Sequence, residues 1–286
     1  MKILAIGDFH GKFPEKLRRR IKNENIDLIL STGDYAGIKE WRPLLKKMFN
    51  SLRQGKEFSI KKYLGKKKYI WLLKKDYAAG KISIKELNKF KIRTFSVFGN
   101  GDWYKTFFND TGKFYENEFK KLKYIKNINR GKIKFRSLKI IGFGGYLDPD
   151  VYFTESGRKA INDSLKQNQK RKKRYDLEEK RLIKLMRFKP DILLSHYTPY
   201  KCLDKMNKKN QIKFSQKGYM GISSFNRVIK KYKPELAICG HMHENQGKCK
   251  IGKTIVINPG ATCDGKAAII DFNEKKGRVK NIRFVK

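Results

Sequence analysis

The chain contains four histidines, and each comes after a short apolar run in company with Gly, Asp, Asn or Ser. The segments that combine these residues are Gly7-Asp8-Phe9-His10, Gly33-Asp34, Gly99-Asn100-Gly101-Asp102, Ser195-His196 and Gly240-His241-Met242-His243. Imidazole, carboxylate and amide groups are ligands that proteins offer to divalent metals. Two such ions close together can hold a hydroxide and the oxygens of a phosphate ester. The segments therefore predict a two-metal site for phosphoester chemistry.

The specificity of this prediction comes from the set of segments and not from any one of them. An isolated Gly-Asp is commonly a turn, and His196 taken alone favours a hydrogen-bonded core histidine over a metal ligand. The Gly-His-x-His segment is more informative, because side chains two apart in an extended chain face the same side. The glycine before each of four candidate ligands is expected to let the backbone turn tightly. These glycines are Gly7, Gly33, Gly99 and Gly240.

The elements that position these residues are short apolar runs, which we interpret as buried strands. They cover residues 3–6, 28–30, 95–98, 138–141, 192–194, 236–239, 255–257 and 267–270. Amphipathic helices are expected over 14–22 and 221–231, and alternation of strands with helices predicts an α/β fold with parallel strands. From Gly247 onward strands follow without helices, which predicts an antiparallel or mixed part of the sheet. Chemistry is expected in loops at the carboxyl ends of the strands.

We expect one domain over 1–286, with helical insertions at about 51–93 and 150–189. The first is rich in lysine and in aromatic residues, which are expected to form a small core of their own; they are Phe58, Tyr63, Tyr69, Trp71 and Tyr77. The second contains a strongly basic run over 166–174, which is expected to be a solvated helix face. Both insertions are candidates for a cap or a basic binding arm.

The formal net charge is +42, from 69 Lys and Arg against 27 Asp and Glu. Such a charge attracts polyanions, so a nucleic acid is a candidate partner beside a phosphate-ester substrate. Lysines spread evenly over the surface would give the same total without a defined binding site. The charge alone therefore does not identify a substrate, and the sequence leaves the oligomeric state open.

The four cysteines show neither a Cys-x-x-Cys pair nor zinc-finger spacing, which predicts reduced, partly buried thiols. They are Cys202, Cys239, Cys249 and Cys263. No apolar run approaches the roughly 18 residues that suggest a membrane span, so no membrane interaction is expected. The apolar N-terminal run is too short for a signal peptide, which predicts a cytoplasmic protein.

The metal-ligand segments resemble, in order and spacing, the five motifs of the calcineurin-like metallophosphoesterase superfamily. The resemblance covers nearly the whole chain outside the two insertions. It implies a four-layer αββα sandwich of mixed β-sheets. Three further segments resemble the Icc-related phosphoesterase subgroup, namely Ile140-Ile141-Gly142-Phe143-Gly144-Gly145, Ser195-His196-Tyr197-Thr198-Pro199 and Asn258-Pro259-Gly260-Ala261.

The resemblance also implies a role for each ligand. One metal would be held by Asp8, His10 and His243, the other by Asn100, His196 and His241, with Asp34 bridging both. A hydroxide between the ions would attack phosphorus in line with the leaving oxygen. The two divalent ions are expected to be Mn, with Fe, Ni, Co and Zn as alternatives.

One position departs from the family pattern, because Gly101 stands where many members have a histidine that assists the leaving group. General-acid help is worth typically ~10²–10⁴-fold, so its loss favours substrates with less basic leaving groups. This predicts a phosphodiesterase in preference to a phosphomonoesterase. Asp102 is either a substitute acid or a hydrogen-bond partner of a ligand histidine, and we favour the partner.

Two alternatives remain at this point. One is a nuclease or 2′,3′-cyclic phosphodiesterase acting on RNA or DNA ends, which the positive charge supports. The other is a catalytically weak metal-binding scaffold for a partner, which the missing histidine supports.

Overall fold

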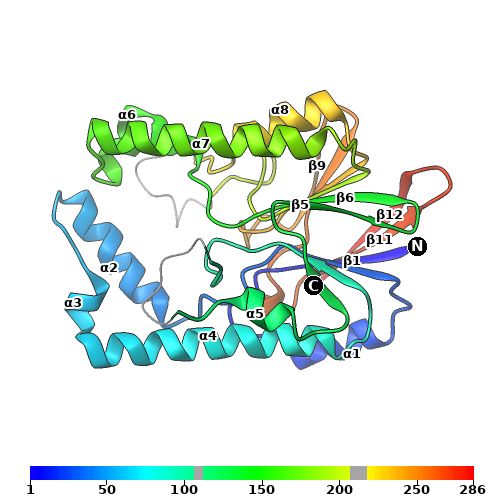
Figure 1. The fold of residues 1–286 in the computed structure, drawn as a ribbon, viewed down its shortest axis with the longest axis horizontal. Coiled ribbons are helices and arrows are strands. Elements are labelled where there is room, and N and C mark those ends of the chain that lie inside the picture. Colours follow the sequence, from blue (N-terminus) through cyan, green and yellow to red (C-terminus); the bar gives the residue numbers. More distant parts are fainter. Residues whose placement is uncertain (106–111, 207–217) are drawn as a thin grey trace.

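The computed structural model describes residues 1–105, 112–206 and 218–286. Strands in these residues form two six-stranded sheets. Figure 1 shows them between two layers of helices, with α7 along the upper side and α4 along the lower side of the view. The four-layer αββα sandwich of mixed sheets is thereby confirmed.

The first sheet has the strand order β12-β11-β1-β2-β3-β4. Neighbours from β1 to β4 run parallel, and β11 is antiparallel to both β1 and β12. Its strands are β1 (Lys2–Ile6), β2 (Leu28–Ser31), β3 (Thr94–Ser96), β4 (Ile125–Asn127), β11 (Ala267–Asn273) and β12 (Arg278–Val285).

The second sheet has the order β5-β6-β7-β8-β10-β9. Its four inner strands are parallel, and the edge strands β5 and β9 are antiparallel to their neighbours. The strands are β5 (Gly131–Phe135), β6 (Leu138–Phe143), β7 (Ile192–Ser195), β8 (Leu236–Ile238), β9 (Gly247–Ile251) and β10 (Thr254–Asn258). The expected antiparallel or mixed pairing after Gly247 is thus confirmed, because β9 is antiparallel to β10 while β10 runs parallel to β8.

Helices α1 (Glu15–Lys22), α4 (Lys66–Asn88) and α5 (Tyr115–Phe119) pack on the first sheet, and α7 (Leu165–Met186) and α8 (Ser223–Tyr232) pack on the second. At the left end of Figure 1, α2 (Trp41–Arg53) and α3 (Ile60–Leu64) extend beyond the sheets. There α2 contacts α6 (Glu155–Ala160), which follows a short 3₁₀ helix at Asp150–Phe153. Another 3₁₀ helix covers Thr262–Asp264.

Successive side chains of each inner strand point to opposite faces of its sheet, so one set packs between the two sheets and the other packs under the helices. In β1, the side chains of Ile3 and Ala5 pack between the two sheets, whereas Leu4 and Ile6 pack under the helices of the first layer. All four are fully buried. Strands covered on both faces need apolar residues at every position, which is why the apolar runs identified the central strands.

The apolar runs missed β4 and β5, and they did not locate β9 and β12, although strands were expected after Gly247. The start of the first helical insertion was placed too late. In β5 only every second residue is partly buried and the others are exposed lysines, so no apolar run marks it. Helical structure in this part of the chain begins at Trp41 rather than near residue 51. The expected strand over 95–98 ends at Ser96, because Val97 and Phe98 belong to the loop that leads to Gly99.

The expectation of four free thiols is wrong for one pair, because Cys202 and Cys249 form a disulfide with their Cα atoms 6.1 Å apart. The two cysteines are 47 residues apart, so local spacing gave no sign of the pairing. Cys202 follows β7 and Cys249 lies in β9, and the fold brings these segments together. The other two cysteines are free and buried.

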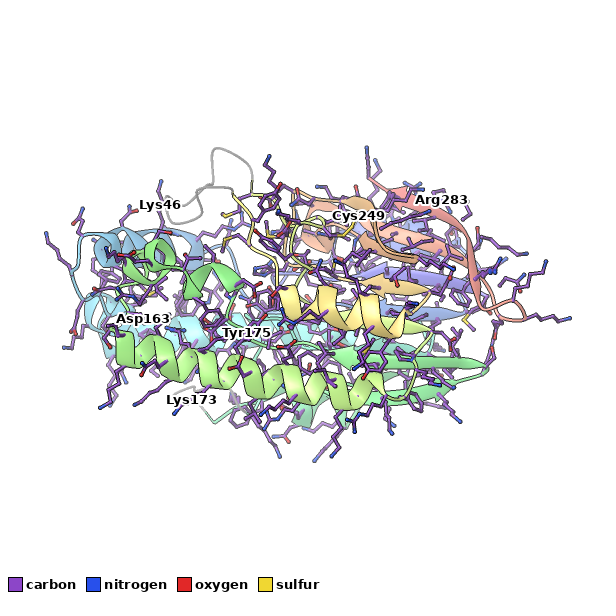
Figure 2. All side chains as sticks on the ribbon, turned by 90° about the horizontal axis from the view of Figure 1, so that it is seen from above. Lys46, Asp163, Lys173, Tyr175, Cys249 and Arg283 are labelled. Atoms are coloured by element: carbon purple, nitrogen blue, oxygen red, sulfur yellow. A yellow bond between two sulfur atoms is a disulfide. The ribbon has the colours of Figure 1, made fainter. Side chains whose placement is uncertain are left out.

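Lysine and arginine side chains project around the whole outline of the molecule in Figure 2, including Lys46, Lys173 and Arg283. In the described ranges, no helix is both long enough and apolar enough to span a membrane.

Candidate metal centre

The residues predicted as ligands lie in loops that follow β1, β2, β3, β7 and β8. These strands are parallel within each sheet, so their carboxyl ends lie at one edge. Backbone hydrogen bonds join the first two loops, with the N–H of Asp8 donating to Gly33 O and that of Phe9 to Asp34 O, both at 2.8 Å. The edge of the sandwich therefore gathers segments that are distant in sequence.

The first candidate metal-binding group consists of Asp8, His10 and His243, whose ligand atoms lie within 4.8 Å of one another. The Nε2 atoms of His10 and His243 are 2.9 Å apart, and Nε2 of His243 is 3.5 Å from Asp8 Oδ1. The other ring nitrogen of His10, Nδ1, is 3.1 Å from the carbonyl oxygen of Ala36. The three side chains thus point at one location.

The second group consists of Asp34, His196 and His241, again with ligand atoms within 4.8 Å. Nε2 of His196 is 3.5 Å from Asp34 Oδ2 and 2.9 Å from Asn100 Oδ1, so the amide of Asn100 joins this group. Nδ1 of His196 lies 2.9 Å from the carbonyl oxygen of Thr32. All seven predicted ligands are therefore brought together in two sets.

These sets fit divalent metal ions by the orientation of their imidazoles. In both His10 and His196 a backbone carbonyl faces Nδ1, which therefore carries the proton and donates it, and the Nε2 lone pair is left for a metal. The backbone N–H of His241 donates to both Asp8 oxygens at 3.1 Å, which links the two sets. Carboxylate, imidazole and amide donors together suit Mn, Fe, Co, Ni or Zn.

Electrostatics favour the ligand form of two of these side chains. Burial, with a contribution from His196, lowers the pKa of His241 to about 3, so its imidazole stays neutral. Burial acts to raise the pKa of Asp8, but its hydrogen bond to His243 and the nearby imidazoles hold that pKa well below its usual range. Burial acts to lower the pKa of His243, but the hydrogen bond to Asp8 and the negative charge of Asp8 raise it.

Four of the seven predicted ligands have backbone φ angles in the left-handed region, which residues with a side chain rarely adopt. The φ values are 55° for Asp8, 47° for His10, 54° for Asp34 and 67° for His241. This conformation costs roughly 1–2 kcal/mol per residue. Such strain persists where the surrounding structure enforces it, and it clusters at functional sites.

A family model described as metallophosphoesterase, calcineurin superfamily, matches residues 1–282. The chain belongs to this family.

Two solved structures with TM-scores above 0.5 have the same fold at low sequence identity. One crystal structure has a TM-score of 0.64 and 20% identity, covering 99% of this chain and 97% of its own. TT1561 of Thermus thermophilus has a TM-score of 0.52 and 16% identity, covering 98% and 96%. The structure of phosphopantetheinyl hydrolase from Mycobacterium tuberculosis matches with a TM-score of 0.48 and 12% identity, over 91% of this chain and 90% of its own. No curated protein sequence matches significantly.

Of the glycines in the metallophosphoesterase motifs, Gly33 has the expected turn conformation, whereas Gly99 has a different role. Gly33 does have a left-handed φ of +90°, and a Cβ there would lie 2.3 Å from the backbone nitrogen of Gly99. Gly99 has no such φ, but a Cβ at this residue would lie 1.9 Å from Asp34 Oδ1. Gly99 is therefore needed because Asp34 approaches its backbone, and not for a tight turn.

Gly101 of this metallophosphoesterase leaves space at the site. Its N–H donates to Asp34 Oδ1 at 2.8 Å. A Cβ at Gly101 would meet its nearest neighbour, the same oxygen, at 3.4 Å, and the residue has no left-handed φ. The position can therefore accept a side chain, but the present residue offers no proton to a leaving group.

Asp102 is completely buried and holds the loop that carries Asp34. Its Oδ2 accepts the N–H groups of Asp34 and Gly99, both at 2.8 Å, and its Oδ1 accepts those of Tyr35 at 2.7 Å and Ala36 at 3.2 Å. Burial and the charge of Asp34 raise the pKa of Asp102 to about 7. Its hydrogen-bond partners in the described ranges are backbone groups and not ligand histidines.

The sequence did not single out Asp76, a buried carboxylate on α4. Its Oδ1 accepts the N–H groups of Gly37 at 2.8 Å and Ile38 at 2.9 Å, and its Oδ2 accepts the indole N–H of Trp103 at 2.8 Å. One carboxylate thus ties α4 to the loops after Asp34 and after Asn100. The available signal was an acidic residue on the apolar face of a helix, between Leu73 and Tyr77.

Proposed function

We propose that the protein is a dinuclear metal-dependent phosphodiesterase. The observation that supports this most strongly is the pair of adjacent ligand groups, in which backbone carbonyls aim two imidazole Nε2 atoms inward. Family membership supports a metal-dependent phosphoester hydrolase, and the preference for diesters is our inference from Gly101. When bound, two divalent ions would supply a hydroxide at neutral pH and neutralise charge on the phosphate.

The chain would contribute a rigid cage for the two ions. Asp8, His10 and His243 would hold one ion, and the second would be held by Asn100, His196 and His241. Asp34 would lie between them, fixed by the N–H of Gly101 on Oδ1. Because strained loops and carbonyl contacts preset these positions, little reorganisation is needed when substrate arrives.

Diesters are favoured because the chain offers little help to a basic leaving group. Gly101 has no side chain, and its N–H is donated to Asp34. Both oxygens of Asp102 are engaged by backbone N–H groups, so this carboxylate is poorly placed to act as the acid. A leaving group that departs without a proton, such as a nitrophenolate, circumvents the missing acid.

The test is hydrolysis of bis(p-nitrophenyl) phosphate, whose leaving group needs no proton, against glycerol 2-phosphate, a monoester whose alkoxide leaving group does, with Mn²⁺ added to metal-free protein. We expect diester turnover to exceed monoester turnover, and Asp34→Asn to remove both. Asp176→Asn is the matched control, because Asp176 is half-exposed on α7 and pairs only with Lys172 among the described residues. An equal loss of diester turnover in Asp34→Asn and Asp176→Asn would contradict the proposal, as would monoester hydrolysis that is faster than diester hydrolysis.

Mn²⁺ and a cytoplasmic location are parts of the same proposal. The mixed oxygen and nitrogen ligands suit Mn as well as Fe, Co, Ni and Zn, so activation by each ion in turn decides the metal. Cell fractionation decides the location. Recovery in a secreted or periplasmic fraction would contradict it. The disulfide between Cys202 and Cys249 counts against the cytoplasmic location, because disulfides are rare in cytoplasmic proteins.

A second candidate is a nuclease or 2′,3′-cyclic phosphodiesterase acting on nucleic-acid ends. The net charge of +42 and the basic side chains around the molecule favour it. Its affinity for a short RNA should fall steeply with salt, whereas turnover of a small diester should change little. RNA binding with a shallow salt dependence would count against a nucleic-acid substrate.

A further inference from the structure

A cavity of about 420 Å³ adjoins the candidate metal centre. The metal-ligand residues His10, Asp34, Asn100 and His243 form one side of it. Much of the remaining lining comes from α2, α3 and α4, and this part is called the helix side of the cavity. These helices lie at the left end of Figure 1. A phosphate ester bound at the metals would therefore have one of its groups directed toward these helices.

The helix side of the cavity is apolar and aromatic. Trp41 and Leu45 lie one turn apart on α2, and Tyr69 and Leu73 lie one turn apart on α4, so each pair shares one helix face. The rings of Trp41 and Tyr69 contact each other edge to face, with centroids 6.4 Å apart. Leu45 is 38% exposed, so part of this apolar wall is open to solvent.

The polar groups of this side are few. Asp76 lies in the wall, but both of its oxygens accept N–H groups from the protein. Arg42 is exposed at the same cavity, and no hydrogen bond or ion pair joins its guanidinium to a residue within the described ranges. Its charge suits the negative phosphate, whereas the remaining wall suits an uncharged apolar group.

We propose that this cavity is a substrate subsite that binds a bulky apolar ester group of the phosphodiester. The proposal rests on the proposed function, because it places the reacting phosphate at the metals. The ester group that stays on the phosphate would pack against Trp41, Leu45 and Tyr69, while Arg42 attracts the anionic part of the substrate. A ring and an alkyl chain share this chemistry, and the experiment separates them.

The experiment compares p-nitrophenyl phosphodiesters whose second ester group is methyl, phenyl or octyl. An apolar pocket discriminates between substrates by roughly 10-fold or more for each additional buried methylene group. The value of kcat/KM should therefore rise at least about 10-fold from the methyl to the phenyl or octyl ester. A larger gain for phenyl indicates a ring, and a larger gain for octyl indicates a chain. Equal values for all three esters would overturn the proposal.

Leu45→Glu tests the wall, because Leu45 is partly exposed and the change requires no repacking of the core. It should reduce the ratio of phenyl to methyl kcat/KM to near one. Leu177→Glu is the matched control, since Leu177 is 48% exposed on α7 and does not line the cavity. This control should keep the wild-type ratio, and an unchanged ratio in Leu45→Glu would contradict the subsite.

Binding without turnover separates this inference from the proposed function. Calorimetric titration with phenylphosphonate and methylphosphonate should show about 10-fold tighter binding of the phenyl compound, lost in Leu45→Glu. Tighter phenyl binding without hydrolysis of any diester would support the subsite and refute the diesterase. Hydrolysis of all diesters together with equal phosphonate affinities would support the diesterase and refute the subsite.

Discussion

Single residues at the metal centre are fixed more by backbone than by other side chains. Carbonyl oxygens of Ala36 and Thr32 set the tautomers of His10 and His196, and backbone N–H groups hold Asp8 and Asp34. The candidate ligands could be singled out from the sequence, because Gly, Asp and His at strand ends have few other uses together, and the structure places these side chains close to one another. Asp102 could not be assigned in that way, because its partners come from a loop that is distant in the sequence.

Gly101→His tests whether the missing histidine sets the preference for diesters. A Cβ at this position meets nothing closer than 3.4 Å, so the imidazole can be accommodated beside Asp34. The ratio of monoester to diester kcat/KM should rise by about 10-fold or more, toward the typical ~10²–10⁴ of general-acid help. Gly101→Ala is the control, and a similar rise in both variants would rule out proton donation as the cause.

Asp102→Asn distinguishes a structural carboxylate from a catalytic acid. Asparagine keeps one acceptor oxygen and replaces the other by a donor that faces buried N–H groups. The free energy of unfolding should fall by about 3 kcal/mol, because each buried donor left without a partner costs about 1–3 kcal/mol. Urea unfolding measures this loss. Unchanged stability together with a lost reaction would instead identify Asp102 as an acid.

At the scale of elements, central strands were predictable and edge strands were not. Strands β1, β2, β7 and β8 are buried on both faces and appear as continuous apolar runs. Strand β5 alternates lysines with half-buried residues, and its pairing with β6 fixes it more than its own sequence does. The long helices α4 and α7 were predictable as helices, but the contact of α4 with the metal loops depends on tertiary packing.

Asp76 is the contact between α4 and the metal loops, and its removal should affect both parts. Asp76→Leu leaves the N–H groups of Gly37, Ile38 and the Trp103 indole without an acceptor. We expect the free energy of unfolding to fall by about 2–5 kcal/mol and diester turnover to fall with it. Asp76→Asn, which keeps one acceptor, should be intermediate. A stable and fully active Asp76→Leu variant would show that the helix and the loops are independent.

At the scale of the whole molecule, charge opposes folding. The 69 basic side chains outnumber the 27 acidic ones, and many ion pairs of the described residues are partly exposed, as for Arg19 with Glu15 and Lys172 with Asp176. Exposed pairs contribute about 0–1 kcal/mol each, whereas repulsion among the excess positive charges is screened by salt. The melting temperature should therefore rise between about 0.05 and 0.5 M NaCl. A fall would mean that ion pairs outweigh the repulsion.

The most direct measurement of the central claim is diester hydrolysis by metal-free protein as Mn²⁺ is added. Two candidate ligand groups at one edge of the sandwich predict that the rate of bis(p-nitrophenyl) phosphate hydrolysis rises until two ions per chain are bound, and that His243→Ala removes this activation. Turnover without metal, full activity with one bound ion, or two bound ions without turnover would contradict a dinuclear phosphodiesterase.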